Sequence, residues 1–242
     1  MTTAAALVIG NEILSGKVEE ENLAYLAKQL WSLGVSLQEV RILRDDVGAI
    51  VPAVRELSAR HSYLFTTGGI GPTHDDVTVE AVAQAFQVSL VRDPTLERLI
   101  RASDPAREPT SSQLRMALIP EGSDLVGGDD QSPWPTVRKE NVYLFPGIPP
   151  YFRRRLDTLR EQLRTTPFVH CLLHTTLGEG ALAEPLNEIV AHFPRVEVGS
   201  YPAVDRADYR VRVSFEGRDR EEVEAAREAL RAILPANVLV DL

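Results

Sequence analysis

Residues 66–78 combine the side chains and the backbone that phosphate chemistry needs. They read Thr-Thr-Gly-Gly-Ile-Gly-Pro-Thr-His-Asp-Asp-Val-Thr. Glycines let a backbone approach a ligand closely, and the start of a following helix directs unpaired NH groups at an anion. Asp75 and Asp76 supply the oxygen ligands that Mg²⁺ prefers, with phosphate and water completing the coordination. We therefore expect a phosphate beside a divalent cation, and the expected ligand-binding residues of the segment are Gly68, Gly69, Gly71, Thr73 and Thr78.

The same segment also has a purely structural interpretation. Thr73 or Asp75 would cap the helix, Asp76 would complement the helix dipole, and the glycines would form a tight turn. A single glycine-rich turn between a strand and a helix is a weak motif. This loop alone therefore does not decide between the two interpretations.

A second polar segment, residues 10–17, follows an apolar run. Its spacing does not match a Walker A loop, because five residues separate its two glycines and Val18 stands where Ser or Thr would bind the cation. Glu12 is a candidate metal ligand or water-activating base, and Asn11 is a candidate ligand donor. Residues 19–21, all Glu, favour a solvated helix start instead.

Asp45 and Asp46 follow another expected strand, so a parallel sheet would bring them to the same edge as Asp76. The alternative for this pair is again helix capping. Asp45 is included in the predicted catalytic set with Glu12, Asp75 and Asp76, and the predicted metal ligands are Glu12, Asp75 and Asp76.

The histidines and the single cysteine favour packing over catalysis. His170 and His174 would share one face of a strand, but two histidines without a third ligand make a poor metal site. Cys171 lies in an apolar segment, and the chain has no Gly-x-Ser-x-Gly motif, so a covalent nucleophile has little support. Metal-assisted attack by water is the enzymatic mechanism that these residues favour.

Alternating strands and helices must position these side chains. Apolar runs at 4–9, 37–43 and 63–67 predict strands, and helical periodicity follows each of them. This alternation predicts an α/β fold with a mostly parallel sheet, helices on both of its faces, and ligands at the carboxyl ends of the strands. Shorter elements toward the C-terminus predict a small α+β module, so we expect domains at 1–166 and 167–242.

The composition of the chain excludes two classes of binding partner. The formal net charge of −9 disfavours binding to nucleic acid, because that affinity comes mainly from Lys and Arg. Apolar runs are too short to span a bilayer, and the first residues lack the basic flank of a secretion signal. We therefore expect a cytoplasmic protein that binds neither nucleic acid nor membrane.

Several motifs in the same order resemble the molybdopterin-binding domain shared by MoaB, MogA and gephyrin, and more closely the CinA proteins and the amino-terminal domain of eukaryotic FAD synthetase. The motifs are residues 10–16, Asn22, residues 69–78, and residues 145–149. The resemblance extends through the C-terminal module. It implies that Glu12, Asp45 and Asp76 match acidic positions of the family, and it adds Pro146 and Gly147 to the expected substrate-binding residues.

The resemblance implies two functions. CinA-like and FAD synthetase-like relatives are associated with metal-dependent hydrolysis of the pyrophosphate in ADP-ribose or FAD. MogA-like relatives bind molybdopterin and support its adenylylation. We expect neither the amidohydrolase activity of longer CinA proteins nor the nucleotidyl transfer of FAD synthetase, because the 242 residues match neither of those domains. Glu20 and Glu21 replace the usual Asp and Thr before Asn22.

We accordingly predict a pyrophosphatase that acts on an ADP-ribose- or FAD-like dinucleotide and uses Mg²⁺ or Co²⁺. One competing hypothesis is a molybdopterin- or nucleotide-binding protein without turnover, and another is a regulatory interaction module. Relatives assemble as oligomers, so the resemblance also implies a homo-oligomer.

Overall fold

The computed structural model describes residues 1–241, and the chain forms two compact units, Met1–Thr165 and Thr166–Leu242. The first unit is built on a six-stranded sheet with the order β2-β1-β3-β8-β7-β6. Strands β2 (Ser36–Leu43), β1 (Thr3–Ile9), β3 (Tyr63–Thr67) and β8 (Val142–Phe145) are parallel, and β7 (Thr136–Lys139) and β6 (Asp124–Val126) continue the sheet in antiparallel pairing.

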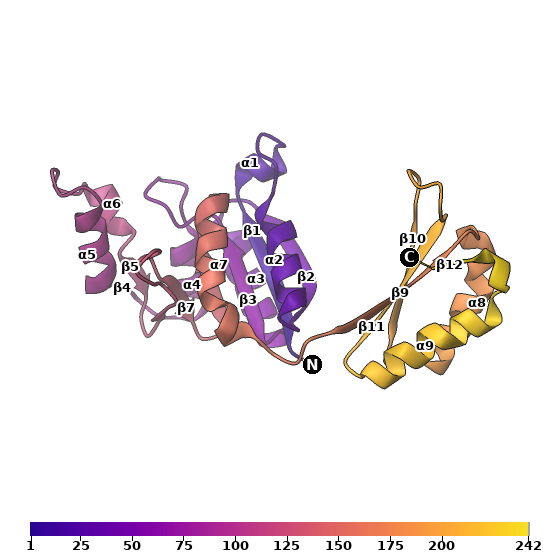
Figure 1. Ribbon diagram of the computed structural model, residues 1–242. Helices are drawn as coiled ribbons and strands as arrows, with labels where there is room; N and C mark the ends of the chain where they lie inside the picture. Colours follow the sequence, from indigo (N-terminus) through magenta and orange to yellow (C-terminus); the bar gives the residue numbers. More distant parts are fainter. Residues whose placement is uncertain (242) are drawn as a thin grey trace. The chain divides into compact units, whose positions relative to one another are not determined.

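Helices cover both faces of this sheet (Figure 1). Alternate residues of the strands pack against the helices of opposite faces. Ala4 and Ala6 of β1 face α2 (Asn22–Ser32) and α7 (Pro149–Leu163), whereas Ala5 and Leu7 face α3 (Val47–Arg60) and α4 (Thr78–Ala85). A strand buried on both faces must be apolar throughout, which explains the uninterrupted apolar run in β1. The expected three-layer α/β architecture is confirmed.

Residues 90–120 form a small separate cluster at the side of the first unit. The short strands β4 (Leu90–Arg92) and β5 (Leu118–Pro120) pair antiparallel, and α5 (Pro94–Ser103) and α6 (Ser111–Arg115) connect them. Asp93 caps α5 by accepting hydrogen bonds from the NH groups of Thr95 and Leu96. The apolar side chains of this cluster are Leu96, Ile100, Ala117 and Ile119.

The second unit is an antiparallel sheet with the order β10-β11-β9-β12, packed against two helices. Its elements are β9 (Val169–Thr175), α8 (Glu179–His192), β10 (Glu197–Pro202), β11 (Val211–Gly217), α9 (Arg220–Ile233), a 3-10 turn (Ala236–Val238) and β12 (Leu239–Val240). The predicted α+β module is thus confirmed. Within residues 1–241, no helix has the length and apolarity to cross a membrane.

The core of the first unit gives a test of this packing. Leu30 of α2 is fully buried against the sheet, so Leu30→Ala should lower the free energy of unfolding by about 2–5 kcal/mol, measured by urea denaturation. Lys28→Ala, on the exposed side of the same helix, should change it by less than about 0.5 kcal/mol. Similar losses for both variants would contradict the packing described here.

Candidate functional site

Four strand ends lie level at one edge of the first sheet. Ile9 of β1 pairs with Leu43 of β2, Val8 of β1 pairs with Thr67 of β3, and Thr67 pairs with Phe145 of β8. All four strands run parallel, so the loops that follow them emerge side by side. Each segment that the sequence singles out for chemistry follows one of these strand ends.

Gly68 brings three of these loops into contact. Its φ is +98°, and a Cβ at this position would overlap with the carbonyl oxygen of Ile9 at the end of β1. On the other side, a Cβ at Gly147 would lie 3.4 Å from the Cα of Gly68. Only glycine satisfies both the left-handed conformation and the close approach of the backbone. The chain after β3 is therefore held between the loops that follow β1 and β8.

Thr78 secures the far end of the glycine loop. Its hydroxyl donates to the carbonyl oxygen of Gly68 at 2.8 Å, and its NH donates to the carbonyl oxygen of Gly69 at 2.9 Å. Thr78 is buried, and it is the first residue of α4. These bonds give Thr78 a structural role in the loop, and its predicted contact with a ligand stays a prediction.

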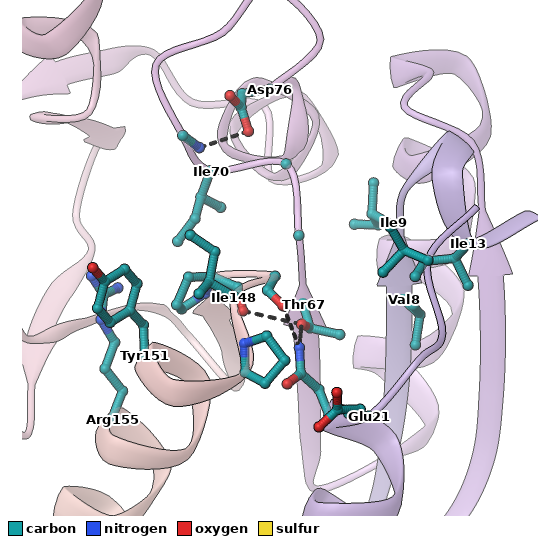
Figure 2. Close-up of a pocket in the computed structure, with 18 of the residues that line it drawn as sticks. Val8, Ile9, Ile13, Glu21, Thr67, Ile70, Asp76, Ile148, Tyr151 and Arg155 are labelled. Atoms are coloured by element: carbon teal, nitrogen blue, oxygen red, sulfur yellow. Dashed lines mark hydrogen bonds between the residues drawn. The ribbon is translucent and has the colours of Figure 1, made fainter. Parts of the chain in front are cut away.

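Asp76 closes the loop between Gly69 and Thr78. Its carboxylate accepts a hydrogen bond from the NH of Gly71 at 2.7 Å (Figure 2). It also accepts from the NH of Thr73 at 2.7 Å and from the hydroxyl of Thr73. The predicted role of Asp76 as a metal ligand or catalyst stays a prediction. The capping interpretation is wrong, because Val77 holds the N-cap position of α4 and no side chain caps that end.

Most NH groups of the glycine loop are already engaged. The NH of Gly68 donates to the carbonyl oxygen of Phe145 at 3.1 Å, and those of Gly71 and Thr73 donate to Asp76. In the described part of the chain, the NH groups of Gly69 and Ile70 make no hydrogen bond. Both residues line the pocket, so their NH groups are available there for an anionic ligand.

The loop after β1 is fixed by the loop after β2. Asp45 accepts a hydrogen bond from the NH of Asn11 at 2.8 Å, at the start of the short helix α1 (Asn11–Leu14). Asp46 caps α3 by accepting from the NH of Gly48 at 3.0 Å. Asp45 therefore orients α1, which carries Glu12, an exposed side chain that lies against Gly10.

Asn22 connects the end of β3 with the loop that follows β8. It was not among the predicted site residues. Its side-chain NH₂ donates to the hydroxyl of Thr67 at 2.9 Å and to the carbonyl oxygen of Gly147 at 2.8 Å. The side chain is buried, and within residues 1–241 its Oδ1 has no hydrogen-bond partner. The signal that could have identified it was its place among the ordered motifs of the resemblance.

The residues before Asn22 also have defined partners. The carboxylate of Glu20 accepts from the NH groups of Asn22 and Leu23, at 3.0 and 2.8 Å, and Glu21 forms an ion pair with Arg153 at 2.8 Å. Glu19 and Glu21 are exposed, as the solvated interpretation expects, and only Glu20 departs from it, because its partly buried carboxylate binds the first NH groups of α2.

A pocket of about 880 Å³ opens over the strand ends. Figure 2 shows Tyr151 and Arg155 on one side of it, Val8, Ile9 and Ile13 on the other, and Asp76 beyond Ile70. The pocket wall includes every predicted catalytic carboxylate and most of the predicted substrate-binding residues, namely Glu12, Asp45, Gly68, Gly69, Gly71, Thr73, Asp75, Asp76, Pro146 and Gly147. Asn11 lines a smaller adjoining hollow, which also includes Glu12 and Asp75.

The carboxylates do not form a protein-only metal cage. Within residues 1–241, no three His, Cys, Asp or Glu side chains are grouped closely enough to hold a metal ion. Hydrogen bonds with Thr73 and with its own backbone NH lower the pKa of Asp75, so this exposed carboxylate is ionised at neutral pH. Mg²⁺ usually takes one or two carboxylates together with substrate phosphates. The donors fit a cation that a ligand helps to hold.

Each of the two units matches a known protein family. Residues 5–165 match the family model described as a probable molybdopterin binding domain, and residues 167–242 match the middle domain of FAD synthase. The CinA protein of unknown function from Thermoplasma acidophilum has a similar structure, with a TM-score of 0.61 and 25% sequence identity over 67% of this chain and 98% of that one.

Two curated relatives extend over both units. A probable FAD synthase from Caenorhabditis elegans is 30% identical over 98% of this chain and 51% of its own length. A CinA-like protein from Frankia casuarinae is 32% identical over 95% of this chain and 59% of its own length. The chain therefore spans about half the length of the FAD synthases that it matches.

Gly68→Ala tests the contact between the loops. The added Cβ would overlap with the carbonyl of Ile9, so the variant should lose at least about 2 kcal/mol more unfolding free energy than Gly16→Ala. Gly16 is a matched control, because its φ is +68° and a Cβ there meets nothing within 4 Å. Urea denaturation of both variants measures the difference, and equal losses would show that backbone conformation alone matters at Gly68.

Asp76→Asn tests the loop-closing role without any metal. Asparagine offers one acceptor oxygen for three donors, so unfolding free energy in EDTA should fall by about 1–3 kcal/mol. Asp46→Asn removes the same charge, but asparagine is an equally good N-cap, so its stability should stay near that of the wild type. Unchanged stability of Asp76→Asn would contradict the structural role.

Proposed function

The chain belongs to the family of probable molybdopterin-binding domains, and from this premise we propose that its pocket binds a small phosphorylated nucleotide or pterin. We propose further that, with a divalent cation, it hydrolyses the pyrophosphate of an ADP-ribose- or FAD-like dinucleotide. The observation that carries the proposal is the single pocket of about 880 Å³ that collects the glycine loop and all four predicted carboxylates. This volume lies within the usual range of roughly 300–1,000 Å³ for small-molecule sites.

The carboxylates suit hydrolysis better than covalent catalysis. Glu12 and Asp75 line both the pocket and the adjoining hollow, and both are exposed, which leaves their oxygens accessible to a cation or to water. A bound Mg²⁺ or Co²⁺ would polarise the phosphoryl oxygens and offset their charge. Asp45 and Asp76 would contribute by holding α1 and the glycine loop in position.

The reaction needs no reagent besides water. In this reaction Glu12 would accept a proton from water as the water oxygen attacks one phosphorus. The bond from that phosphorus to the bridging oxygen breaks, and the bridging oxygen leaves with the second phosphate. The products are AMP and a second phosphate monoester. The NH groups of Gly69 and Ile70 would donate to the oxygens on which negative charge develops.

A second candidate function is binding of a pterin or nucleotide without turnover. It is favoured by the absence, within residues 1–241, of any three-residue metal cluster, and by the engagement of Asp45 and Asp76 in loop hydrogen bonds. A pocket organised in this way holds its shape without a cation. Under this alternative, the apolar wall that includes Ile9, Ile13 and Ile148 would bind the planar ring of the ligand.

Release of AMP from ADP-ribose or FAD decides between the two functions. With Mg²⁺ or Co²⁺, the wild type should release AMP, and Glu12→Gln should lower kcat by about 100-fold or more through loss of the base. Asp75→Asn should raise the metal concentration needed for half-maximal rate. Glu80→Gln, an exposed carboxylate on α4 outside the pocket, is the control and should match the wild type.

Activity that survives in Glu12→Gln would contradict the assigned base. Absence of AMP release by the wild type, together with tight binding of a pterin, would instead establish the binding function. Asp76→Asn is a poorer probe of catalysis, because its effect on the loop is expected even without metal.

A further inference from the structure

Arg155 lines the pocket on the side that the sequence motifs do not mark. It lies one helical turn after Tyr151 on α7, and both side chains face the pocket while Phe152 and Leu156 of the same helix are buried in the core (Figure 2). Helix α7 begins directly after the loop that contains Gly147. The packing of its buried side chains in the core and the contact of the preceding loop with Gly68 hold it beside the pocket.

The guanidinium of Arg155 has no anionic partner. Within residues 1–241, no carboxylate pairs with it and no hydrogen bond engages it, whereas Arg153 on the same helix pairs with Glu21 at 2.8 Å. Its one described contact is with the ring of Trp134, whose centroid lies 6.0 Å from the guanidinium carbon. Burial lowers the pKa of Arg155 to about 10, so the side chain remains charged at neutral pH.

An unpaired, partly desolvated cation is unfavourable unless something offsets its charge. The opposite side of the pocket cannot do this in the free protein, since its carboxylates are directed into the loops or exposed to water. Those carboxylates also repel a phosphate. The pocket thus needs positive charge to attract an anion. Two arginines of α7 line it: Arg154 is exposed to water, whereas Arg155 is partly buried beside Trp134 and so carries a charge that water offsets less.

We propose that Arg155 is the phosphate-binding residue of this pocket and that it restricts the ligands to phosphate esters and diphosphates, against uncharged nucleosides and pterins. The inference rests on the proposed function of the same pocket. The planar guanidinium donates in a fork that fits two phosphate oxygens, and Trp134 supports its plane. Gly69 and Ile70 remain available for further oxygens of the ligand.

Binding of inorganic pyrophosphate, measured by titration calorimetry and by thermal unfolding, tests this assignment. Arg155→Met should lower the affinity for pyrophosphate by about 10- to 100-fold, the loss expected for charge-assisted hydrogen bonds. Arg155→Lys keeps the positive charge but not the two-pronged guanidinium donor, so its affinity for pyrophosphate should lie between those of the wild type and Arg155→Met. Without ligand, Arg155→Met should unfold at the wild-type temperature or above it, because the unpaired charge is gone.

Arg164→Met is the matched control. It removes the same charge at the end of α7, outside the pocket and paired with Glu161 at 2.7 Å, and it should bind pyrophosphate as the wild type does. If Arg155→Met fails to fold, Arg155→Gln replaces it, and the same loss of affinity for pyrophosphate, about 10- to 100-fold relative to the wild type, is expected. Pyrophosphate binding of Arg155→Met at wild-type affinity, or no binding by the wild type at millimolar concentration, overturns the assignment.

The two proposals fail separately. Wild-type AMP release together with unchanged pyrophosphate affinity in Arg155→Met would leave hydrolysis standing and overturn the role of Arg155. Pyrophosphate binding that depends on Arg155, without any AMP release, would support the role of Arg155 and overturn hydrolysis.

Discussion

The close approach of Gly68 to its two neighbouring loops is the constraint on which the site depends. The carbonyl of Ile9 at the end of β1 leaves no room for a Cβ at Gly68, and the loop after β8 lies in van der Waals contact with Gly68 at Gly147. The contact sets where the glycine loop leaves the sheet and where α7 begins, so it positions both sides of the pocket. Asn22 reinforces it from beneath by bonding to Thr67 and Gly147. Four parallel strands with level ends make this arrangement possible.

Charge in the pocket is divided unequally between its two sides. The loops after β1, β2 and β3 contribute carboxylates, and several of these hold the loops themselves together, as Asp45 does with Asn11 and Asp76 does with Gly71. Helix α7 contributes Arg155, which pairs with no carboxylate among the described residues. A ligand that carries both phosphate and a cation would satisfy the two sides at once. The two kinds of charge in the pocket therefore fit a phosphorylated ligand bound together with a cation, which is the ligand of the proposed reaction.

Periodicity was sufficient to predict the layered architecture, because β1 is apolar throughout and α2 repeats leucine at helical spacing. The strand-end rule likewise directed attention to Glu12, Asp45 and Asp75. The sequence could not predict which groups the carboxylate of Asp76 would bind, because its hydrogen bonds with Gly71 and Thr73 depend on the conformation of the loop. Arg155 was missed because a charged residue beside Phe152 and Leu156 resembles the solvent face of a helix until the fold brings α7 to the pocket. The two-residue strand β12 is too short for any periodic signal.

The central claim is that phosphate binds between the glycine loop and α7. A crystal structure of the chain with ADP-ribose and Mg²⁺ tests it most directly. We expect a phosphate group within hydrogen-bonding distance of the NH of Gly69 or Ile70 and of the guanidinium of Arg155. A ligand that is bound with its phosphates away from both groups, or that lies outside this pocket, would contradict it.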